Sequence, residues 1–309
     1  MKAIVCTKYG SPDDVLKLMD IAKDSPKNRE IQIKIHATTV TSGDCRVRGF
    51  KSPLLYWIPM RLFLGISKPR NSVLGVELAG EVVAIGEDVR RFKKGDQVYA
   101  LNGMRFGAHA QYICLSEDAP VALKPVNATY EEAAAIPFGG TTALHFLRKG
   151  KIQSGQKVLI YGASGAVGTA AVQLANHFGS EVTGVCSGAN AGLVRSLGAH
   201  HVIDYTMENF AEKGQRYDLI FDAVGKISKA QCRKAMEPSG RYITVDGQGI
   251  AKVSEKDLLL LKELTEAGDI RSVIDRRYPL EQIADAYHYV EKGHKKGNVI
   301  ITVGHDGGE

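Results

Sequence analysis

The sequence predicts an α/β protein with a doubly wound parallel sheet and a second, β-rich domain, and three observations support this prediction. From about residue 157, short apolar runs alternate with helical patterns, which is the order of a parallel sheet with helices on both faces. Residues 1 to about 124 instead hold alternating or apolar runs that Gly and Pro separate, with few helical patterns between them. A chain of 309 residues is also long enough for two domains.

The stretch 157–168, KVLIYGASGAVG, organises the predicted parallel sheet. An apolar run at 158–161 predicts a strand buried on both faces, and an Ala-rich pattern at 166–178 predicts the helix that follows it. Between them, Gly162 allows a tight turn, Gly165 lets the backbone approach a pyrophosphate, and Gly168 lets the helix pack close to the strand.

The N-terminus of this helix favours an anion, so the pattern predicts a dinucleotide site, and the alternative is a Gly-rich turn that binds no nucleotide. The candidate cofactor-binding residues of the turn are Gly162, Ala163, Ser164, Gly165, Ala166, Val167 and Gly168.

The remaining elements follow from the same patterns. After residue 157 we expect further strands at 181–186, 201–203, 218–221 and 241–245, and helices at 190–197, 206–212, 228–236, 255–267 and 281–292. A helix at 131–147 should break or restart at Pro137. Strands of the N-terminal half are expected at 3–6, 31–37, 80–85, 97–100 and 110–115. A last apolar run at 298–303 predicts a strand whose sheet the pattern does not identify.

Composition and charge are those of a soluble globular protein, with 44% hydrophobic and 24% charged residues. Five scattered cysteines without CxxC spacing predict a reducing, cytoplasmic compartment and argue against disulfides or a clustered zinc site. The chain begins with a strand-like KAIVC, which predicts no signal peptide, and no apolar run approaches the ~20 residues of a membrane span. The net charge of +6 suits an anionic ligand, but without a dense Lys/Arg block it does not favour nucleic-acid binding.

Several motifs together resemble the medium-chain dehydrogenase/reductase superfamily, most closely its zinc-independent quinone oxidoreductase-like branch. They occur in the family's order at Gly75-Val76-Glu77-x-Ala79-Gly80, Gly95-Asp96-x-Val98, Gly140-x-Thr142-Ala143, Ala163-x-Gly165-x-x-Gly168, Gly198-Ala199 and Asp222-x-Val224-Gly225. The resemblance implies a GroES-like catalytic domain of residues 1–124 and 270–309 and a Rossmann dinucleotide-binding domain of residues 125–269. It also implies NADPH-dependent hydride transfer to a quinone or an activated double bond.

The positions that match the catalytic zinc ligands of related alcohol dehydrogenases hold Thr41, Val76 and Phe138. None of these side chains offers the imidazole or thiolate that zinc usually takes. The four-cysteine structural lobe of those relatives is also missing. We therefore expect no zinc and no metal ligand.

The choice between NADP and NAD depends on the end of the second strand, where an NAD site carries an acidic residue. No acid occurs from residue 182 to 198, and Glu181 lies at the wrong end of the strand, so a 2′-phosphate should meet no carboxylate and Ser187 can donate to it. The resemblance adds Tyr205 beside that phosphate and Val224 at the cofactor. Candidate cations are Arg195, Lys295 and Lys296, because Ala189 and Asn190 stand where relatives often have a basic residue. We expect NADPH.

On the catalytic side, the resemblance places Thr142 beside the nicotinamide and Thr41 and Asp44 beside the substrate. Tyr56 is a possible substitute for a tyrosine that relatives carry where this chain has Arg46. The alternatives are that Thr142 bonds to its own helical turn and that Asp44 caps the segment after it. With no dedicated acid, the acceptor should be an electrophilic small molecule such as a quinone, an enone or an alkenal. A sensor or scaffold without turnover, and an alcohol or carbonyl dehydrogenase, are the alternative functions.

The connection at 246–256 is too short for the crossover and strand that would complete a six-stranded sheet. In relatives the sixth strand commonly joins two subunits. The sequence therefore predicts a five-stranded sheet and either a weakened homodimer or a monomer. The alternative is that a segment is missing from the sequence itself.

Overall fold

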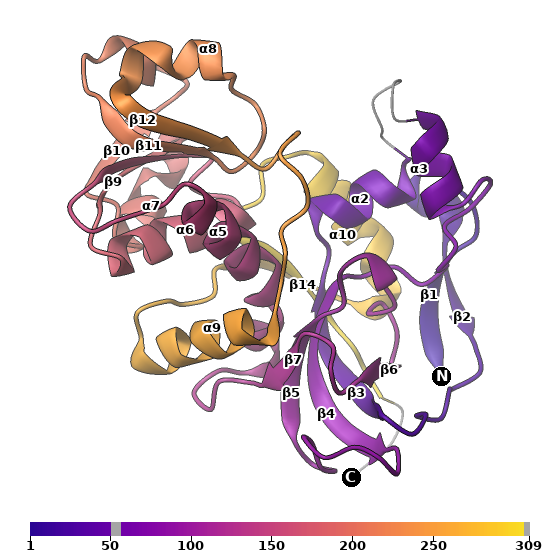
Figure 1. The fold of residues 1–309 in the computed structure, drawn as a ribbon. Coiled ribbons are helices and arrows are strands. Elements are labelled where there is room, and N and C mark those ends of the chain that lie inside the picture. The colour runs from indigo at the N-terminus through magenta and orange to yellow at the C-terminus, as the bar shows by residue number, and fades with distance from the viewer. Residues whose placement is uncertain (51–56, 306–309) are drawn as a thin grey trace. The chain divides into compact units, whose positions relative to one another are not determined.

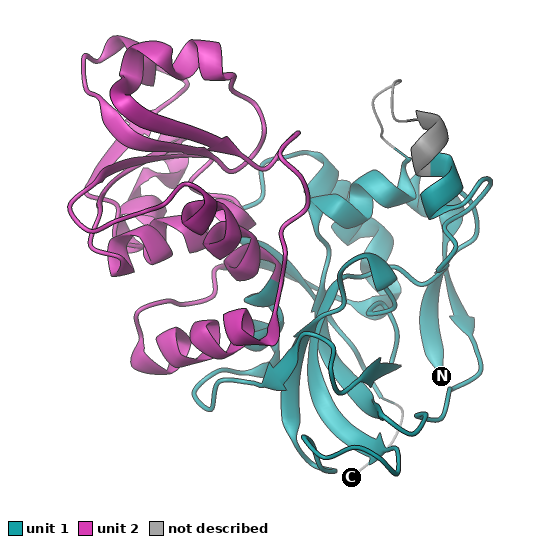
Figure 2. Cartoon of the chain, in the orientation of Figure 1, with its two compact units in different colours: residues 1–137, 274–309 teal, residues 138–273 magenta. Residues whose placement is uncertain are grey.

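The computed structural model describes residues 1–50 and 57–305, with only the backbone of residues 57–60, and divides the chain into two compact units. Unit 1 comprises residues 1–137 and 274–309, and unit 2 comprises residues 138–273 (Figure 2). The sequence patterns place these boundaries at 124/125 and 269/270. They differ because the short helix α4 (Tyr130–Ala134) packs against strands of unit 1.

Unit 2 is built on a five-stranded parallel sheet in the order β10-β9-β8-β11-β12 (Figure 1). Its strands are β8 (Lys157–Tyr161), β9 (Glu181–Cys186), β10 (His201–Asp204), β11 (Tyr217–Asp222) and β12 (Met236–Thr244). In chain order this is 3-2-1-4-5, the order of a doubly wound sheet without its sixth strand. From β12 the chain reaches α9 (Glu255–Ala267) without a further strand, so the five-stranded prediction is confirmed.

The helices and strands of unit 2 follow the predicted alternation with two corrections, one to a helix and one to a strand. The helices are α5 (Pro137–Lys149), α6 (Ala166–His177), α7 (Ala191–Ser196), α8 (Lys229–Cys232) and α9, with 3₁₀ turns at Gly188–Asn190, Phe210–Glu212 and Arg233–Ala235. The helix predicted at 206–212 is wrong over its first half, because the Asp204 carboxylate binds the backbone N–H and hydroxyl of Thr206 and forms a turn instead. The strand predicted at 241–245 begins earlier, at Met236.

Unit 1 holds a seven-stranded sheet and a separate hairpin. The sheet runs β13-β14-β3-β4-β5-β7, with β6 pairing to β3, and β1 pairs with β2. The strands are β1 (Lys2–Cys6), β2 (Leu16–Asp20), β3 (Glu30–Thr39), β4 (Glu77–Ile85), β5 (Gln97–Leu101), β6 (Tyr112–Ser116), β7 (Val121–Leu123), β13 (Ile274–Pro279) and β14 (Asn298–Thr302). Because β14 pairs antiparallel with β3 and parallel with β13, the strand that the pattern left unassigned belongs to unit 1.

The helices of unit 1 are short, and most span too few residues to show a helical periodicity in the sequence. They are α1 (Pro12–Val15), α2 (Ser42–Arg48), α3 (Trp57–Leu64), α4 and α10 (Ile283–Glu291), with 3₁₀ turns at Gly103–Arg105 and Leu280–Gln282. Only α10 and the helix pair around Pro137 match expected helices, and α5 restarts at Pro137 as predicted. Strands β2 and β13 were also not predicted, because both are largely exposed and show no apolar alternation.

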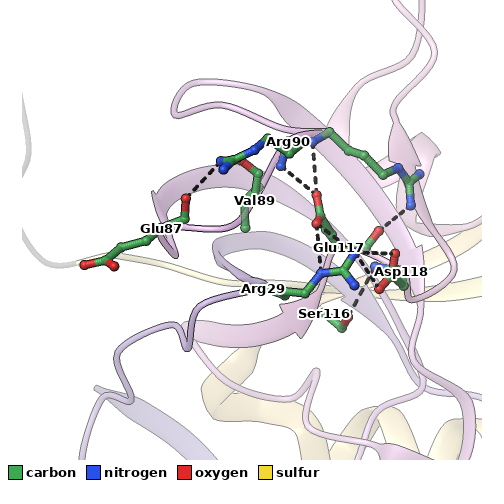
Figure 3. A network of polar contacts seen from close by, with 8 residues as sticks. Arg29, Glu87, Val89, Arg90, Ser116, Glu117 and Asp118 are labelled. Carbon is green, nitrogen blue, oxygen red and sulfur yellow. Dashed lines mark hydrogen bonds and ion pairs between the residues drawn. The ribbon is translucent and has the colours of Figure 1, made fainter.

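A buried carboxylate fixes one loop of unit 1 to its sheet (Figure 3). Glu117, just after β6, is 1% exposed. Its carboxylate accepts the backbone N–H groups of Arg90 and Arg91, at 2.8 and 3.0 Å, and the Arg29 guanidinium at 3.2 Å. The two backbone donors, together with Arg29, hold the pKa of Glu117 below its ordinary value of 4.5.

We expect Glu117→Gln to lower the free energy of unfolding at neutral pH, because an amide accepts these donors less strongly. The ionised carboxylate stabilises the fold above about pH 4.5, and this contribution disappears as the pH falls through the lowered pKa. Urea unfolding between pH 7 and pH 3 should therefore show a gap between variant and wild type that narrows toward acid.

Asp118→Asn is the matched control, because the exposed Asp118 carboxylate contacts the same Arg29 but no backbone donor of the 90–91 loop. It should change stability little. If the difference in unfolding free energy between Glu117→Gln and wild type is the same at every pH, or if Asp118→Asn loses as much stability, the ionised Glu117 carboxylate does not stabilise the 90–91 loop.

Candidate functional site

The three glycines of the turn after β8 differ in how much room each has for a side chain. Gly162 has φ +77°, and a methyl group there would lie 2.6 Å from Val224 Cγ1. A methyl group at Gly168 would collide with the Gly162 carbonyl oxygen and lie 2.8 Å from Ala163 Cα. At Gly165 the nearest atom to such a methyl group would be the Gly162 carbonyl oxygen, at an ordinary van der Waals distance of 3.6 Å, so no neighbouring atom crowds this position. These contacts agree with the predicted tight turn at Gly162, close packing at Gly168 and open approach at Gly165.

Helix α6 begins without a side-chain cap. Its N-cap residue is Gly165, which has no side chain to offer, whereas Thr or Ser side chains cap α2, α4 and α8. In the described part of the chain, the backbone N–H groups of Ala166, Val167 and Gly168 have no hydrogen-bond partner. Unpaired donors at the positive end of a 12-residue helix favour an anion, and the predicted pyrophosphate site at this turn stays a prediction.

Two serine hydroxyls share one partner here, Ser164 in the glycine turn and Ser187 just after β9. The side-chain amide of Asn190 donates to Ser164 Oγ at 3.2 Å and to Ser187 Oγ at 3.1 Å. Within the described ranges, neither serine hydroxyl donates a hydrogen bond. Arg195, on α7, is exposed and forms no ion pair there. Burial and the negative charge of Asp204 raise the pKa of Cys186, at the last position of β9, to about 11, and the positive charge of Arg195 opposes this rise in part. Tyr205 is 52% exposed after β10. Unit 2 therefore collects hydroxyl donors and a cation around this strand end.

The expectation that a phosphate here meets no carboxylate is wrong. A methyl group at Gly188 would collide with the Asp204 carboxylate, so an acid from the neighbouring strand lies beside the turn after β9. Asp204 ends β10 opposite Cys186, and this parallel register is a tertiary feature that a search along the chain does not find. The Thr206 hydroxyl and backbone N–H both donate to Asp204 Oδ1, and together with the Gly188 backbone they lower the pKa of Asp204.

A second carboxylate, Asp222, holds the turn after β11. It is fully buried and accepts the backbone N–H groups of Val224, Gly225 and Ile227, at 3.1, 2.9 and 2.9 Å. The turn therefore presents Val224 to Gly162. The motif Asp222-x-Val224-Gly225 marks this turn in the sequence, but only the structure shows that the aspartate organises it.

Thr142 lies on α5, which packs closely against the start of α6. A methyl group at Gly139, one turn before Thr142, would lie 2.7 Å from the Ala166 carbonyl oxygen. In the described part of unit 2, the Thr142 hydroxyl makes no hydrogen bond, so the alternative that it bonds to its own turn is not observed. The structure thus brings the helix of Thr142 to the glycine turn, and its place beside a nicotinamide stays a prediction.

The predicted substrate-side residues of unit 1 form a capping box at the start of α2. Thr41 Oγ1 donates to Asp44 Oδ2 at 2.6 Å and accepts the Asp44 backbone N–H at 3.1 Å. Asp44 is fully buried and also accepts the N–H groups of Thr41 and Gly75, at 2.8 and 3.1 Å. This is the capping alternative for Asp44, and a substrate role for either residue stays a prediction. Tyr56 lies outside the described residues.

The two lysines proposed for the 2′-phosphate belong to unit 1. Lys295 Nζ donates to the Gly297 carbonyl oxygen, and the backbone N–H of Lys296 donates to Asp275 at 2.8 Å. Burial lowers the pKa of Lys295 to about 8, although the negative charge of Glu77 raises it in part. The phosphate role of both lysines stays a prediction, since Ser187, Arg195 and Tyr205 are in unit 2.

Glu77 and His109 form a buried polar group close to this lysine. Both are fully buried, Thr39 Oγ1 donates to Glu77, and His109 Nε2 donates to the Thr39 carbonyl oxygen at 2.9 Å. Burial lowers the pKa of His109, which favours the neutral ring. Sequence reasoning missed this group, because Glu77 was used only as part of a motif. Among the described residues, no group of three or more His, Cys, Asp or Glu side chains could hold a metal ion.

Comparisons with known proteins agree with this architecture. Residues 27–125 match the alcohol dehydrogenase GroES-like domain, and residues 166–285 match the family model called zinc-binding dehydrogenase. The chain is 36% identical to a 2-methylene-furan-3-one reductase of Solanum lycopersicum and 33% identical to an NADPH-dependent alkenal/one oxidoreductase of Arabidopsis thaliana. Each match covers 97% of this chain and 79% of the relative. A quinone oxidoreductase structure from Coxiella burnetii superposes with a TM-score of 0.86 at 26% identity, over 98% of this chain and 99% of that one.

Fold and sequence together define a medium-chain dehydrogenase/reductase. Within that superfamily, the chain belongs to the quinone oxidoreductase-like branch. The name of the zinc-binding model carries no information about zinc here, because its match at 166–285 excludes positions 41, 76 and 138.

We expect Gly168→Ala to destabilise unit 2 by about 1–3 kcal/mol, since the new methyl group has no room between the helix and the turn. Gly192→Ala on α7 is the control, because a methyl group there meets no atom within 4 Å and should be neutral or stabilising. Denaturant unfolding of both variants checks the pair. A Gly168→Ala protein as stable as wild type contradicts the close packing.

We expect stability to depend on Lys295 in alkaline solution. Between pH 8 and 10.5 the unfolded chain keeps a proton that folded Lys295 has lost, so this residue makes the free energy of unfolding rise with pH. Lys295→Met should remove that rise, which amounts to at most about 3 kcal/mol. Unfolding of wild type, Lys295→Met and the exposed control Lys296→Met across this range tests it. Parallel curves for all three proteins would show that Lys295 titrates normally.

Proposed function

We propose that this enzyme of the medium-chain family reduces activated double bonds and quinones with NADPH and without zinc. The observation that carries the proposal is the uncapped start of α6, where three backbone N–H groups lie unpaired behind an open Gly165. A pyrophosphate fits such a site in charge and in hydrogen bonding. The names of the tomato and Arabidopsis relatives support the substrate class.

The preference for NADPH rests on the donors at the end of β9. The Ser187 hydroxyl, the Arg195 guanidinium and the exposed Tyr205 would hold a 2′-phosphate. The Asp204 carboxylate opposes this role, because hydrogen bonds from Thr206 lower its pKa and keep it ionised, so the 2′-phosphate depends on these donors to outweigh it. Lys295 and Lys296 are further candidates for contact with this phosphate.

The reduced nicotinamide supplies the hydride when the cofactor is bound, and the chain's own residues bind and orient. Thr142 has a hydroxyl free to bond the nicotinamide side. Thr41 is not free in this way, since its hydroxyl proton is committed to Asp44. Asp44 itself accepts three hydrogen bonds as a carboxylate. Without a free acid among these residues, the acceptor must be electrophilic by itself, as an enone, an alkenal or a quinone is.

The remaining parts of the proposal concern metal, location and assembly. Thr41, Val76 and Phe138 offer neither imidazole nor thiolate for a catalytic zinc. Among the described helices, none has the length and apolar character that a membrane crossing requires. A cytoplasmic location remains a prediction, as some relatives are named chloroplastic or mitochondrial. The missing sixth strand supports a weakened homodimer or a monomer.

We expect the purified protein to oxidise NADPH in the presence of an enone, an alkenal or a quinone, but not a saturated ketone, with unchanged rates after chelation. The value of kcat/KM should be higher for NADPH than for NADH. Gly165→Asp should weaken NADPH binding by roughly 100-fold, because it puts a negative charge beside the pyrophosphate. Gly165→Asn has the same size without the charge and should lose much less. Absorbance at the reduced-nicotinamide band and a binding titration give both results.

Each of three outcomes would overturn a different part of the proposed function. Undiminished NADPH affinity in Gly165→Asp removes the pyrophosphate site. Equal kcat/KM for the two coenzymes removes the phosphate preference. NADPH binding without turnover of any acceptor leaves the sensor interpretation in place of the enzyme.

A further inference from the structure

Asn190 occupies the N-cap position of α7 but does not cap that helix. Asparagine is among the residues that cap helices best, yet the Asn190 side chain makes no hydrogen bond to the first turn of α7. Its amide nitrogen instead donates to Ser164 in the glycine turn and to Ser187 after β9. The Asn190 side chain therefore links the segments that follow β8 and β9 instead of making an N-cap hydrogen bond to α7.

The orientation of this amide decides what the two hydroxyls can do. Each serine oxygen accepts one amide N–H, so the proton of each hydroxyl remains available, and no described residue accepts it. Asn190 Oδ1 is buried without a partner. If the Asn190 amide were rotated by 180°, its NH2 group would occupy the buried position of Oδ1, where the structure offers no hydrogen-bond partner. Two unpaired N–H donors would then replace one unpaired acceptor. The observed orientation is therefore favoured, and it makes both hydroxyls donors.

Two hydroxyl donors at these positions match the two phosphate groups of one nucleotide. Ser164 lies in the turn beside the unpaired N–H groups of α6, and Ser187 lies at the strand end near Arg195. A phosphate accepts hydrogen bonds and donates none at neutral pH, whereas a ribose hydroxyl gains less from a charged, donor-only environment. The Asp204 carboxylate, beside Gly188, is the charge that works against a phosphate here.

We propose that Asn190 is a positioning residue that fixes the hydroxyls of Ser164 and Ser187 as donors and thereby selects a nucleotide carrying a 2′-phosphate. This inference rests on the proposed function and adds a specificity determinant to it. Asn190 need not touch the nucleotide, since it acts through the two serines.

Nucleotide fragments without nicotinamide test the proposal independently of turnover. Calorimetric titration with 2′,5′-ADP and with 5′-AMP gives the ratio of their affinities. In wild type, 2′,5′-ADP should bind more tightly. Asn190→Asp keeps a good N-cap residue but turns its two donors into acceptors, so it should draw both serine protons inward and cut the affinity ratio by about 100-fold. Asn190→Ala leaves the hydroxyls free to rotate and should cut the ratio by about tenfold.

Two controls separate positioning from charge and from structure. Ala189→Asp adds a carboxylate at the exposed neighbouring position without touching the serines. It therefore measures the effect of the added charge alone, and Asn190→Asp should cut the affinity ratio further than Ala189→Asp does. In a Ser187→Ala background, Asn190→Ala should have little further effect on 2′,5′-ADP, which a merely structural role would not produce. Thermal unfolding checks that all variants fold.

An unchanged ratio in both Asn190 variants overturns the inference, as does an equal effect of Ala189→Asp or full additivity with Ser187→Ala. Failure of wild type to bind either fragment is a different result, which overturns the proposed nucleotide site and this inference with it. Tight binding of both fragments with equal affinity overturns the inference alone.

Discussion

The close approach of α6 to the turn after β8 is the constraint on which unit 2 depends. The Gly168 backbone packs against the Gly162 carbonyl oxygen at a separation that no side chain tolerates. This contact brings the first turn of a 12-residue helix to the end of the central strand of the sheet. The same glycines leave the helix without a side-chain cap, so a packing requirement and an anion site arise from the same residues.

Buried carboxylates organise the loops of both units in a common way. Asp44, Glu117 and Asp222 are each almost fully buried, and each accepts two or more backbone N–H groups from a loop or helix start. Such bonds satisfy donors that no strand or helix pairs, and they keep the loop in one conformation. For Asp44, this role accounts for its burial without any part in chemistry. It also explains why the best-matched substrate-side residues offer no free proton donor.

The ends of β8, β9 and β10 together contribute to one candidate binding surface. Along the chain, Ser164, Ser187 and Asp204 belong to three separate segments. Parallel pairing of β8, β9 and β10 brings the ends of these strands to one edge of the sheet. There Asn190 bonds to both Ser164 and Ser187, and Asp204 lies beside Gly188 in the turn after β9. The local balance between phosphate and hydroxyl recognition is therefore a property of strand register rather than of one motif.

The sequence by itself determined the five parallel strands, most of their alternating helices, the glycine turn and the family, because apolar periodicity and glycine spacing are local signals. It also determined that the connection after β12 is too short for a sixth strand. Only the tertiary structure decided that β14 joins β3 in unit 1, that Asp204 lies beside Gly188, and that Thr41 and Asp44 are bound to each other. Short or exposed elements such as α2, β2 and β13 carry no periodic signal, since few of their side chains are buried or their length is below two helical turns. Contacts between distant segments depend on strand register and backbone direction, which residue patterns along one chain do not specify.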